Sequence, residues 1–249
     1  MQDVQTKLDS AFLRDVGLNL QAAIPLEQLP ETLRQQLHQA CPQAADFRQL
    51  LLFGNGGPRF WQAAQTHMEA NANLTNAQEA HPLDQFSITM VEQFIRDELG
   101  AEASYLFLYP GSFTLNLQSL GSLLAWHQNS PLMIGIHPEF GLWSAYRVLV
   151  LCNSNFASSL PLQQRSAEQK SVSICVACQT RACVQACPAN AMDHAGFHLD
   201  RCWQYRSQEE SMCRVRCVAR LACPVGTEHR YSDEQIHYHY AQSLVFMRK

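Results

Sequence analysis

Apolar residues recur along the chain with two kinds of spacing, and each kind predicts a different element. Spacing of three and four residues predicts helices over 2–16, 27–40, 58–70, 81–100, 112–128 and 230–246. Short continuous apolar runs predict buried strands at 47–53, at 103–109 and at both ends of 131–152. Helices and strands that mix in this way predict a layered fold, which we assign to the α+β class.

Composition adds limits to this outline. The chain has 249 residues, of which 47% are hydrophobic and 16% charged, as in globular proteins with one large core or two smaller ones. No apolar run approaches the roughly 20 residues of a membrane span, and the N-terminus lacks the order of a signal peptide. We therefore expect no membrane span and a cytoplasmic protein, in which cysteines serve more often as metal ligands than in disulfides.

The cysteines carry the clearest chemical signal. Eight of the ten lie in two groups of four, and each group ends in Cys-Pro. The groups read Cys175-x2-Cys178-x4-Cys183-x3-Cys187-Pro and Cys202-x10-Cys213-x3-Cys217-x5-Cys223-Pro. In two-cluster ferredoxins the cysteine before proline ligates the other cluster. The spacing therefore predicts two [4Fe–4S] clusters, one held by Cys175, Cys178, Cys183 and Cys223, the other by Cys187, Cys202, Cys213 and Cys217.

Two alternatives to this ligand set stay open. One is zinc, which paired C-x2-C elements with a regular spacer would favour, although this chain has one such element. The other is a single cluster in place of two.

The charges are distributed unevenly between the cysteine segment and the rest. Residues 171–230 hold seven Arg and five Asp or Glu, a net +2, while the remaining 11 basic and 17 acidic residues give −6. Arginines beside an anionic thiolate cluster would offset its charge and tune its potential. The overall charge of −4 argues against a nucleic-acid partner, which needs a basic surface.

Four segments resemble CblC-type cobalamin-processing proteins. The segment I-G-I-H-P-E-F-G-L-W-S-A-Y-R-V-L-V-L (134–151) resembles that family's C-I-H-P-x-F-G-G-W-F-A-I-R-G-V-V-L, and R-Y-S-D-E-Q-x-x-Y (230–238) resembles its R-Y-S-E-E-Q-x-x-Y. H-P-L-D-Q (81–85) and F-H-L-D-R-C-W-Q-Y-R (197–206) are similar to two further family motifs. The cysteine groups, with Arg201-Cys202-Trp203-Gln204-Tyr205, resemble epoxyqueuosine reductase and the reductive dehalogenases instead.

These resemblances imply a nitroreductase-like domain that binds cobalamin base-off and carries a ferredoxin-like module. We expect the first domain at 1–170, with 153–170 as a linker at its end, the two-cluster module at 171–229, and a C-terminal segment, 230–249, that packs back on the first domain. The family signature implies cobalamin contacts from His137, Pro138, Phe140, Gly141, Trp143 and Arg147. The alternative for His137 is a loop-fixing role, and for Trp143 a place in the core.

The sequence thus predicts a cobalamin-binding iron–sulfur reductase or carrier, fed by a ferredoxin, a flavodoxin or a reductase. Electrons would pass from the clusters to cobalamin and assist removal of its upper ligand, or keep it reduced. The alternatives are a cobalamin-dependent reductase of an organic substrate, a plain electron-transfer protein, and a flavin enzyme that binds FMN.

Overall fold

A computed structural model describes residues 5–70, 81–113, 115–161 and 173–247. The described residues belong to two compact units. Unit 1 comprises Met1–Leu124 with Ala145–Leu162, and unit 2 comprises Ala125–Ser144 with Gln163–Lys249. This division differs from the predicted one, because residues 125–144 and the C-terminal segment both group with the cysteines. The prediction that residues 230–249 pack on the first domain stays a prediction.

Unit 1 is built around a four-stranded sheet with the strand order β1-β2-β4-β3. Its strands are β1 (Leu20–Pro25), β2 (Gln49–Gly56), β3 (Tyr105–Tyr109) and β4 (Ser144–Cys152). The pairs β1–β2 and β3–β4 are antiparallel. All eight residues of β2 are buried, which explains its continuous apolar sequence. The α+β class is confirmed.

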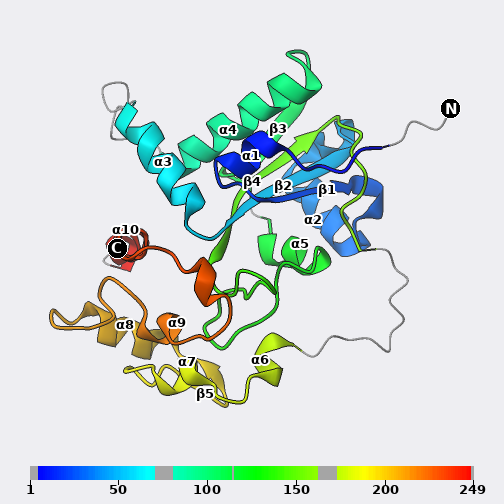
Figure 1. Cartoon of the computed structure of the whole chain (residues 1–249). Coiled ribbons are helices and arrows are strands. Elements are labelled where there is room, and N and C mark those ends of the chain that lie inside the picture. The colour runs from blue at the N-terminus through cyan, green and yellow to red at the C-terminus, as the bar shows by residue number, and fades with distance from the viewer. Residues whose placement is uncertain (1–4, 71–80, 114, 162–172, 248–249) are drawn as a thin grey trace. The chain divides into compact units, whose positions relative to one another are not determined.

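The helices of unit 1 supply the apolar faces that the sheet needs. They are α1 (Ala11–Asp15), α2 (Glu31–Ala40), α3 (Arg59–Ala70), α4 (Pro82–Leu99) and α5 (Leu117–Leu123), with short 3-10 helices at Leu26–Gln28 and Pro42–Asp46. Figure 1 shows α4 running along the sheet, and the Phe94 ring of α4 lies 5.8 Å from that of Phe53 in β2. Leu83, Phe86, Met90, Val91 and Phe94 of α4 are buried at the helical spacing that predicted this element.

Two predicted helices of unit 1 are shorter than expected, and one strand predicted in residues that belong to unit 2 was wrong. Residues 2–4 of the helix expected over 2–16 lie outside the described residues; the rest forms α1, five residues long, because Ser10 caps it and Gln21 of β1 holds the Ser10 backbone. The helix expected over 112–128 is α5, seven residues long. The strand expected at the start of 131–152 is absent there among the described residues, where single bridges such as Gln128–Ile136 stand instead. Strand β1 has no counterpart among the sequence predictions.

Part of the segment predicted as a linker, residues 153–161, packs against the sheet of unit 1. The backbone N–H of Ser159 donates to the Ala23 carbonyl of β1 at 2.8 Å, and the Ala23 N–H donates to the Ser159 hydroxyl at 3.0 Å. The Gln49 side chain of β2 bonds Ser154 and Phe156. Residues 153–161 thereby satisfy backbone groups of the sheet edge and side chains of unit 1. Residues 162–170 of the predicted linker lie outside the described residues.

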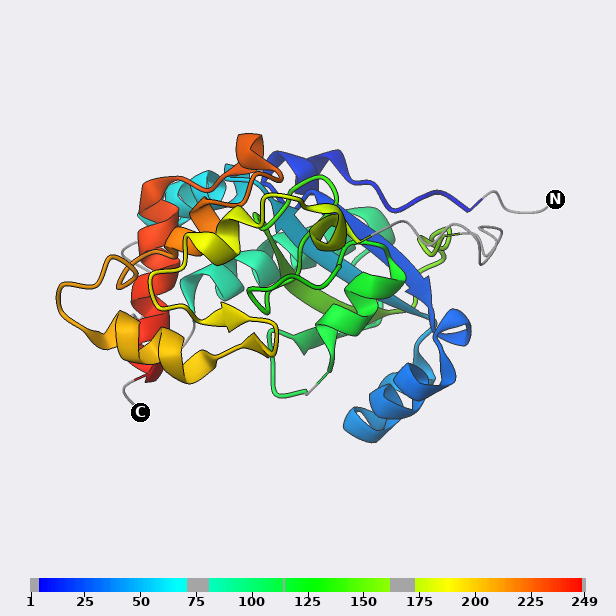
Figure 2. The same ribbon diagram turned by 90° about the horizontal axis from the view of Figure 1, so that it is seen from below.

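Unit 2 is made of short elements joined by long loops. They are α6 (Ile174–Ala177), α7 (Ala182–Gln185), α8 (Leu199–Ser207), α9 (Val218–Leu221), a 3-10 helix at Thr227–His229 and α10 (Asp233–Met247), with a two-stranded hairpin of β5 (Met192–Asp193) and β6 (Gly196–Phe197). Figure 2 shows α8 beside α10. The helix predicted at the C-terminus is confirmed as α10.

Two small apolar clusters hold unit 2 together. In the first, Leu132, Ile136 and Leu142 pack with residues of the cysteine segment, among them Met192 and Cys223. In the second, Trp143 packs with Tyr231 and Ile236. The segment 125–144 therefore supplies the core on which the cysteine loops fold. Among the described residues, no helix is long and apolar enough to cross a bilayer.

Candidate metal centre

The eight grouped cysteines all lie in unit 2, on short helices and the loops beside them. Cys175 is in α6 and Cys178 directly follows it, while Cys183 is in α7 and Cys187 follows that helix. Cys202 is in α8, Cys217 caps α9, and Cys213 and Cys223 lie in loops. Such short helices turn the chain quickly enough to bring several thiols of one segment to one place.

The first set of neighbours is centred on Cys175. Burial first, and then the neighbouring thiols of Cys223, Cys183 and Cys178, raise the pKa of the Cys175 thiol to about 11. Cys183 has a raised pKa for the same reasons, burial first and then Cys223. Cys223 is thus a neighbour of the first cysteine group although it belongs to the second in sequence.

The second set is centred on Cys202. Burial raises the pKa of Cys202, the thiols of Cys217, Cys187 and Cys213 add to this rise, and Arg206 opposes it. Burial likewise raises the pKa of Cys213, with Cys217 and Cys187 as its charged neighbours. The eight grouped thiols therefore form two sets of four neighbours, which are the same sets as those predicted for two clusters. Ligation itself stays a prediction.

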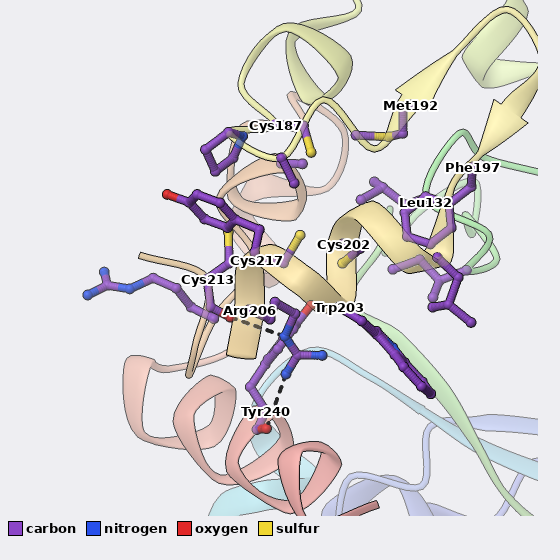
Figure 3. Close-up of a pocket in the computed structure, with 17 residues that line it drawn as sticks. Leu132, Cys187, Met192, Phe197, Cys202, Trp203, Arg206, Cys213, Cys217 and Tyr240 are labelled. Carbon is purple, nitrogen blue, oxygen red and sulfur yellow. Dashed lines mark hydrogen bonds between the residues drawn. The ribbon is translucent and has the colours of Figure 1, made fainter. Parts of the chain in front are cut away.

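The second set surrounds a cavity of about 170 Å³. Figure 3 shows the sulfur atoms of Cys187, Cys202 and Cys217 turned toward its interior, with Cys213 to one side. The rest of the lining is mainly apolar and aromatic, and includes Leu132, Met192, Phe197, Trp203 and Tyr240. A cavity of roughly 150 Å³ holds a guest as large as benzene.

The four thiols of the second set line the walls of one cavity. Within the part of the chain that the structure describes, no group of three or more His, Cys, Asp or Glu side chains is arranged closely enough to hold a metal ion. Zinc would require four sulfurs at about 2.3 Å from one point. The iron–sulfur cluster expected from the sequence therefore stays a prediction.

The arginines of the module occupy distinct environments. Arg206 is buried and lines the cavity, with its guanidinium 5.0 Å from the ring of Tyr240. Arg220 donates to the Leu142 carbonyl at 2.6 Å and lies 4.5 Å from the ring of Trp143. Arg201 is half exposed and bonds Asp193, whereas Arg181, Arg214 and Arg216 are partly or fully exposed. One arginine of the six is thus both buried and part of the cysteine cavity.

The loop of residues 137–143, called the signature loop because cobalamin contacts are predicted there, packs directly on the end of the cysteine segment. His137 and Gly141 close the loop through two backbone hydrogen bonds of 2.8 and 2.9 Å. Gly141 and Gly226 both have positive φ, 56° and 65°, and a Cβ on either would overlap the other segment's backbone. Gly226 lies three residues after Cys223, so the signature loop abuts the turn that follows a predicted cluster ligand.

The His137 ring is held in one tautomer. Its Nδ1 accepts the backbone N–H groups of Glu139 at 3.1 Å and Phe140 at 3.2 Å, so the proton of the neutral ring is on Nε2. Burial, and then the neighbouring His229, lower the pKa of His137 to about 4, which keeps the ring neutral. His137 can therefore donate a hydrogen bond through Nε2. It cannot ligate a metal there without losing both backbone bonds.

The other signature residues are placed as follows. Trp143 is fully buried against Tyr231, Phe140 is buried beside His229, and Pro138 is exposed. Arg147 is in unit 1, where its Nε donates to Asn55 at 2.6 Å and its guanidinium lies 4.5 Å from the Phe60 ring. Trp143, Phe140 and Arg147 each have a structural contact, and the predicted role of all four residues toward cobalamin stays a prediction.

The sequence analysis missed several residues in and around the site. Tyr240 of α10 and Leu132 line the cysteine cavity from segments far from the cysteines in the chain. Asp193 holds the hairpin to α8 by accepting from His198 at 2.7 Å and Arg201 at 3.2 Å. The F-H-L-D-R motif contains His198 and Arg201, so its polar residues could have suggested the contact with Asp193.

Comparison with known proteins shows similarity of fold. No family model and no curated protein matches the sequence. A structure of epoxyqueuosine reductase with an epoxyqueuosine-modified stem loop of tRNA-Tyr has a TM-score of 0.52 and 10% identity, over 91% of this chain and 66% of that one. The enzyme from Bacillus subtilis has a TM-score of 0.51 and 11% identity, over 89% and 65%. This chain thus spans about two thirds of the length of those enzymes.

These findings bear on two of the sequence predictions. The fold agrees with the resemblance to epoxyqueuosine reductase, and the comparison gives no support to the CblC-type assignment. A structure of the same fold is bound to a tRNA stem loop, which conflicts, at the level of the fold, with the expectation that nucleic acid is not a partner.

Proposed function

We propose that this protein is a cytoplasmic reductase or carrier that binds base-off cobalamin and passes electrons to it from two [4Fe–4S] clusters. In this proposal unit 1 corresponds to a nitroreductase-like domain and the cysteine segment to a ferredoxin-like module. The observation that carries it is the position of the signature loop, which shares a compact unit with the eight thiols and abuts the turn after Cys223.

The residues of this chain would have separable tasks. Eight thiolates would hold iron, in the two sets centred on Cys175 and Cys202. His137 would donate its Nε2 proton to an amide or phosphate oxygen and leave cobalt without a protein ligand, which suits a base-off state. When bound, the clusters would supply single electrons and cobalamin a reducible cobalt.

Anaerobic purification followed by titration with hydroxocobalamin tests the proposal. We expect iron and sulfide in equal amounts and a base-off absorption spectrum on addition of cobalamin. Cys202→Ala should lose cobalamin reduction and keep cobalamin binding, and the matched control Cys41→Ala, at a buried cysteine outside the groups, should keep both. If no corrin co-elutes and no base-off spectrum forms, the proposal is wrong.

The same experiment separates the other electron-transfer functions. A plain electron-transfer protein would contain iron and sulfide and would leave the cobalamin spectrum unchanged. A flavin enzyme would release FMN on denaturation.

A second candidate function is reduction of a modified nucleoside in RNA. It is favoured by the fold shared with epoxyqueuosine reductase and by the arginines of residues 171–230. Fluorescence anisotropy with a tRNA anticodon stem loop, at two salt concentrations, tests it. Binding that weakens steeply with salt would support it, because phosphate contacts release counterions. No binding at low salt would exclude it.

A further inference from the structure

Arg206 is a buried charge whose hydrogen-bond partners are all uncharged. It is 9% exposed, and it donates to the Cys213 carbonyl at 3.2 Å, the Tyr240 carbonyl at 3.3 Å and the Ser243 hydroxyl at 2.8 Å. A buried guanidinium without a counter-charge is costly. Its folded position therefore needs a negative charge nearby that the hydrogen bonds do not supply.

The cavity beside Arg206 is where such a charge would arise. The described residues that line the cavity include four cysteines and no Asp or Glu. Figure 3 shows Arg206 below these thiols, with its hydrogen bonds to Cys213 and Tyr240. Thiolates that hold an iron–sulfur cluster carry net negative charge, so a loaded cavity would supply the missing partner for Arg206.

The position of this charge is fixed from two sides. The Cys213 carbonyl belongs to the loop of a predicted ligand, and Tyr240 and Ser243 belong to α10. A guanidinium held in three directions cannot turn away when the charge in the cavity changes. Arg216 also lines the cavity but is exposed, so water screens its charge.

We propose that Arg206 sets the reduction potential of the cluster held by Cys187, Cys202, Cys213 and Cys217. This inference rests on the proposed function. Reduction of the cluster adds one electron and breaks no bond, so the cavity becomes more negative by one charge. A fixed positive charge in a poorly hydrated site stabilises the reduced form and raises the potential. Arg206 acts on the cluster as a positioning residue, through charge.

Redox titration of the purified protein, with dithionite as reductant and EPR as the readout, tests the proposal. We expect Arg206→Gln to shift one of two couples to a more negative potential and to leave the other in place. A tenfold smaller ratio of reduced to oxidised cluster at a fixed potential corresponds to a shift of about 59 mV for a one-electron couple. Arg206→Lys should restore most of the potential, and Arg214→Gln, which removes a more exposed charge outside the cavity, should change neither couple.

Each outcome is decisive. If Arg206→Gln assembles both clusters with unchanged potentials, the inference is wrong. If Arg206→Gln loses one cluster, Arg206→Lys decides: an assembled cluster with a nearly unchanged potential supports a charge effect, and loss in that variant too would show that Arg206 is only a structural clamp. Absence of iron and sulfide from the unsubstituted protein would instead refute the proposed function.

Discussion

The contact between Gly141 and the turn after Cys223 gives a prediction whose size follows from the geometry. A Cβ at Gly141 would overlap the Val225 carbonyl, with the carbonyl carbon at 2.8 Å and the Gly226 nitrogen at 3.2 Å. Carbon atoms pack best at about 3.5–4.0 Å. The Gly141→Ala variant must therefore push two backbone segments apart, and no side-chain rotation can relieve the overlap.

The cost of Gly141→Ala has two parts. Its φ of 56° costs a residue with a Cβ about 1–2 kcal/mol. The overlap adds about 1–3 kcal/mol, the usual penalty of overpacking. We expect unit 2 to lose about 3 kcal/mol of its free energy of unfolding.

Ala125 provides a matched measure of the first part alone. It has a φ of 58° in the same unit, so Ala125→Gly should regain the same cost of about 1–2 kcal/mol, reduced by the larger conformational entropy that glycine loses on folding. Urea denaturation of each variant, followed by tryptophan fluorescence, gives both numbers. The reasoning is refuted if the free energy of unfolding lost by Gly141→Ala is no larger than that gained by Ala125→Gly. The backbone overlap would then have no measurable cost.

Three further predictions follow from other contacts. The pKa of His137 is about 4 in the folded protein and near 6.5 in the unfolded chain, so the unfolded chain binds more protons between these pH values. Acidification from pH 7 to pH 5 should therefore lower the free energy of unfolding, measured by urea denaturation, by about 2 kcal/mol. The His137→Asn variant, whose side-chain oxygen can accept the same two N–H groups, should abolish this loss. Arg147→Met removes the charged donor that lies 2.6 Å from the Asn55 oxygen and should destabilise unit 1 by about 1–3 kcal/mol, whether or not cobalamin is present, as thermal denaturation would measure; an unchanged melting temperature would contradict it. The hydrogen bond with His198 is the main cause that lowers the pKa of Asp193 to about 2. Hydrogen exchange should therefore show the β5–β6 hairpin protected at pH values above the ordinary carboxyl pKa near 3.8, and opening as the pH falls toward 2. The Asp193→Asn variant should open this hairpin at neutral pH.

Local patterns predicted the elements whose stability depends on a regular apolar face. Helix α4, with its glycine stop, and the buried strand β2 appear within a few residues of their predicted bounds. Strand β1 was missed because its alanines carry little strand preference and its burial comes from pairing with β2. Helix α5 ends early beside Tyr146, whose hydroxyl packs against Gly121. Such contacts join residues far apart in sequence and leave no local pattern.

By itself, the sequence predicted the chemical character of the candidate centre. Two groups of four cysteines, each ending in Cys-Pro, predict thiolate ligands, and the ferredoxin pattern predicts a four-and-four partition, which the neighbouring thiols of the structure follow. Only the tertiary structure decided that residues 125–144 form one unit with these cysteines and that Arg206, among six arginines, is buried beside four of them. The physical reason is that burial and charge pairing depend on packing between distant segments, whereas ligand spacing is a property of the chain itself.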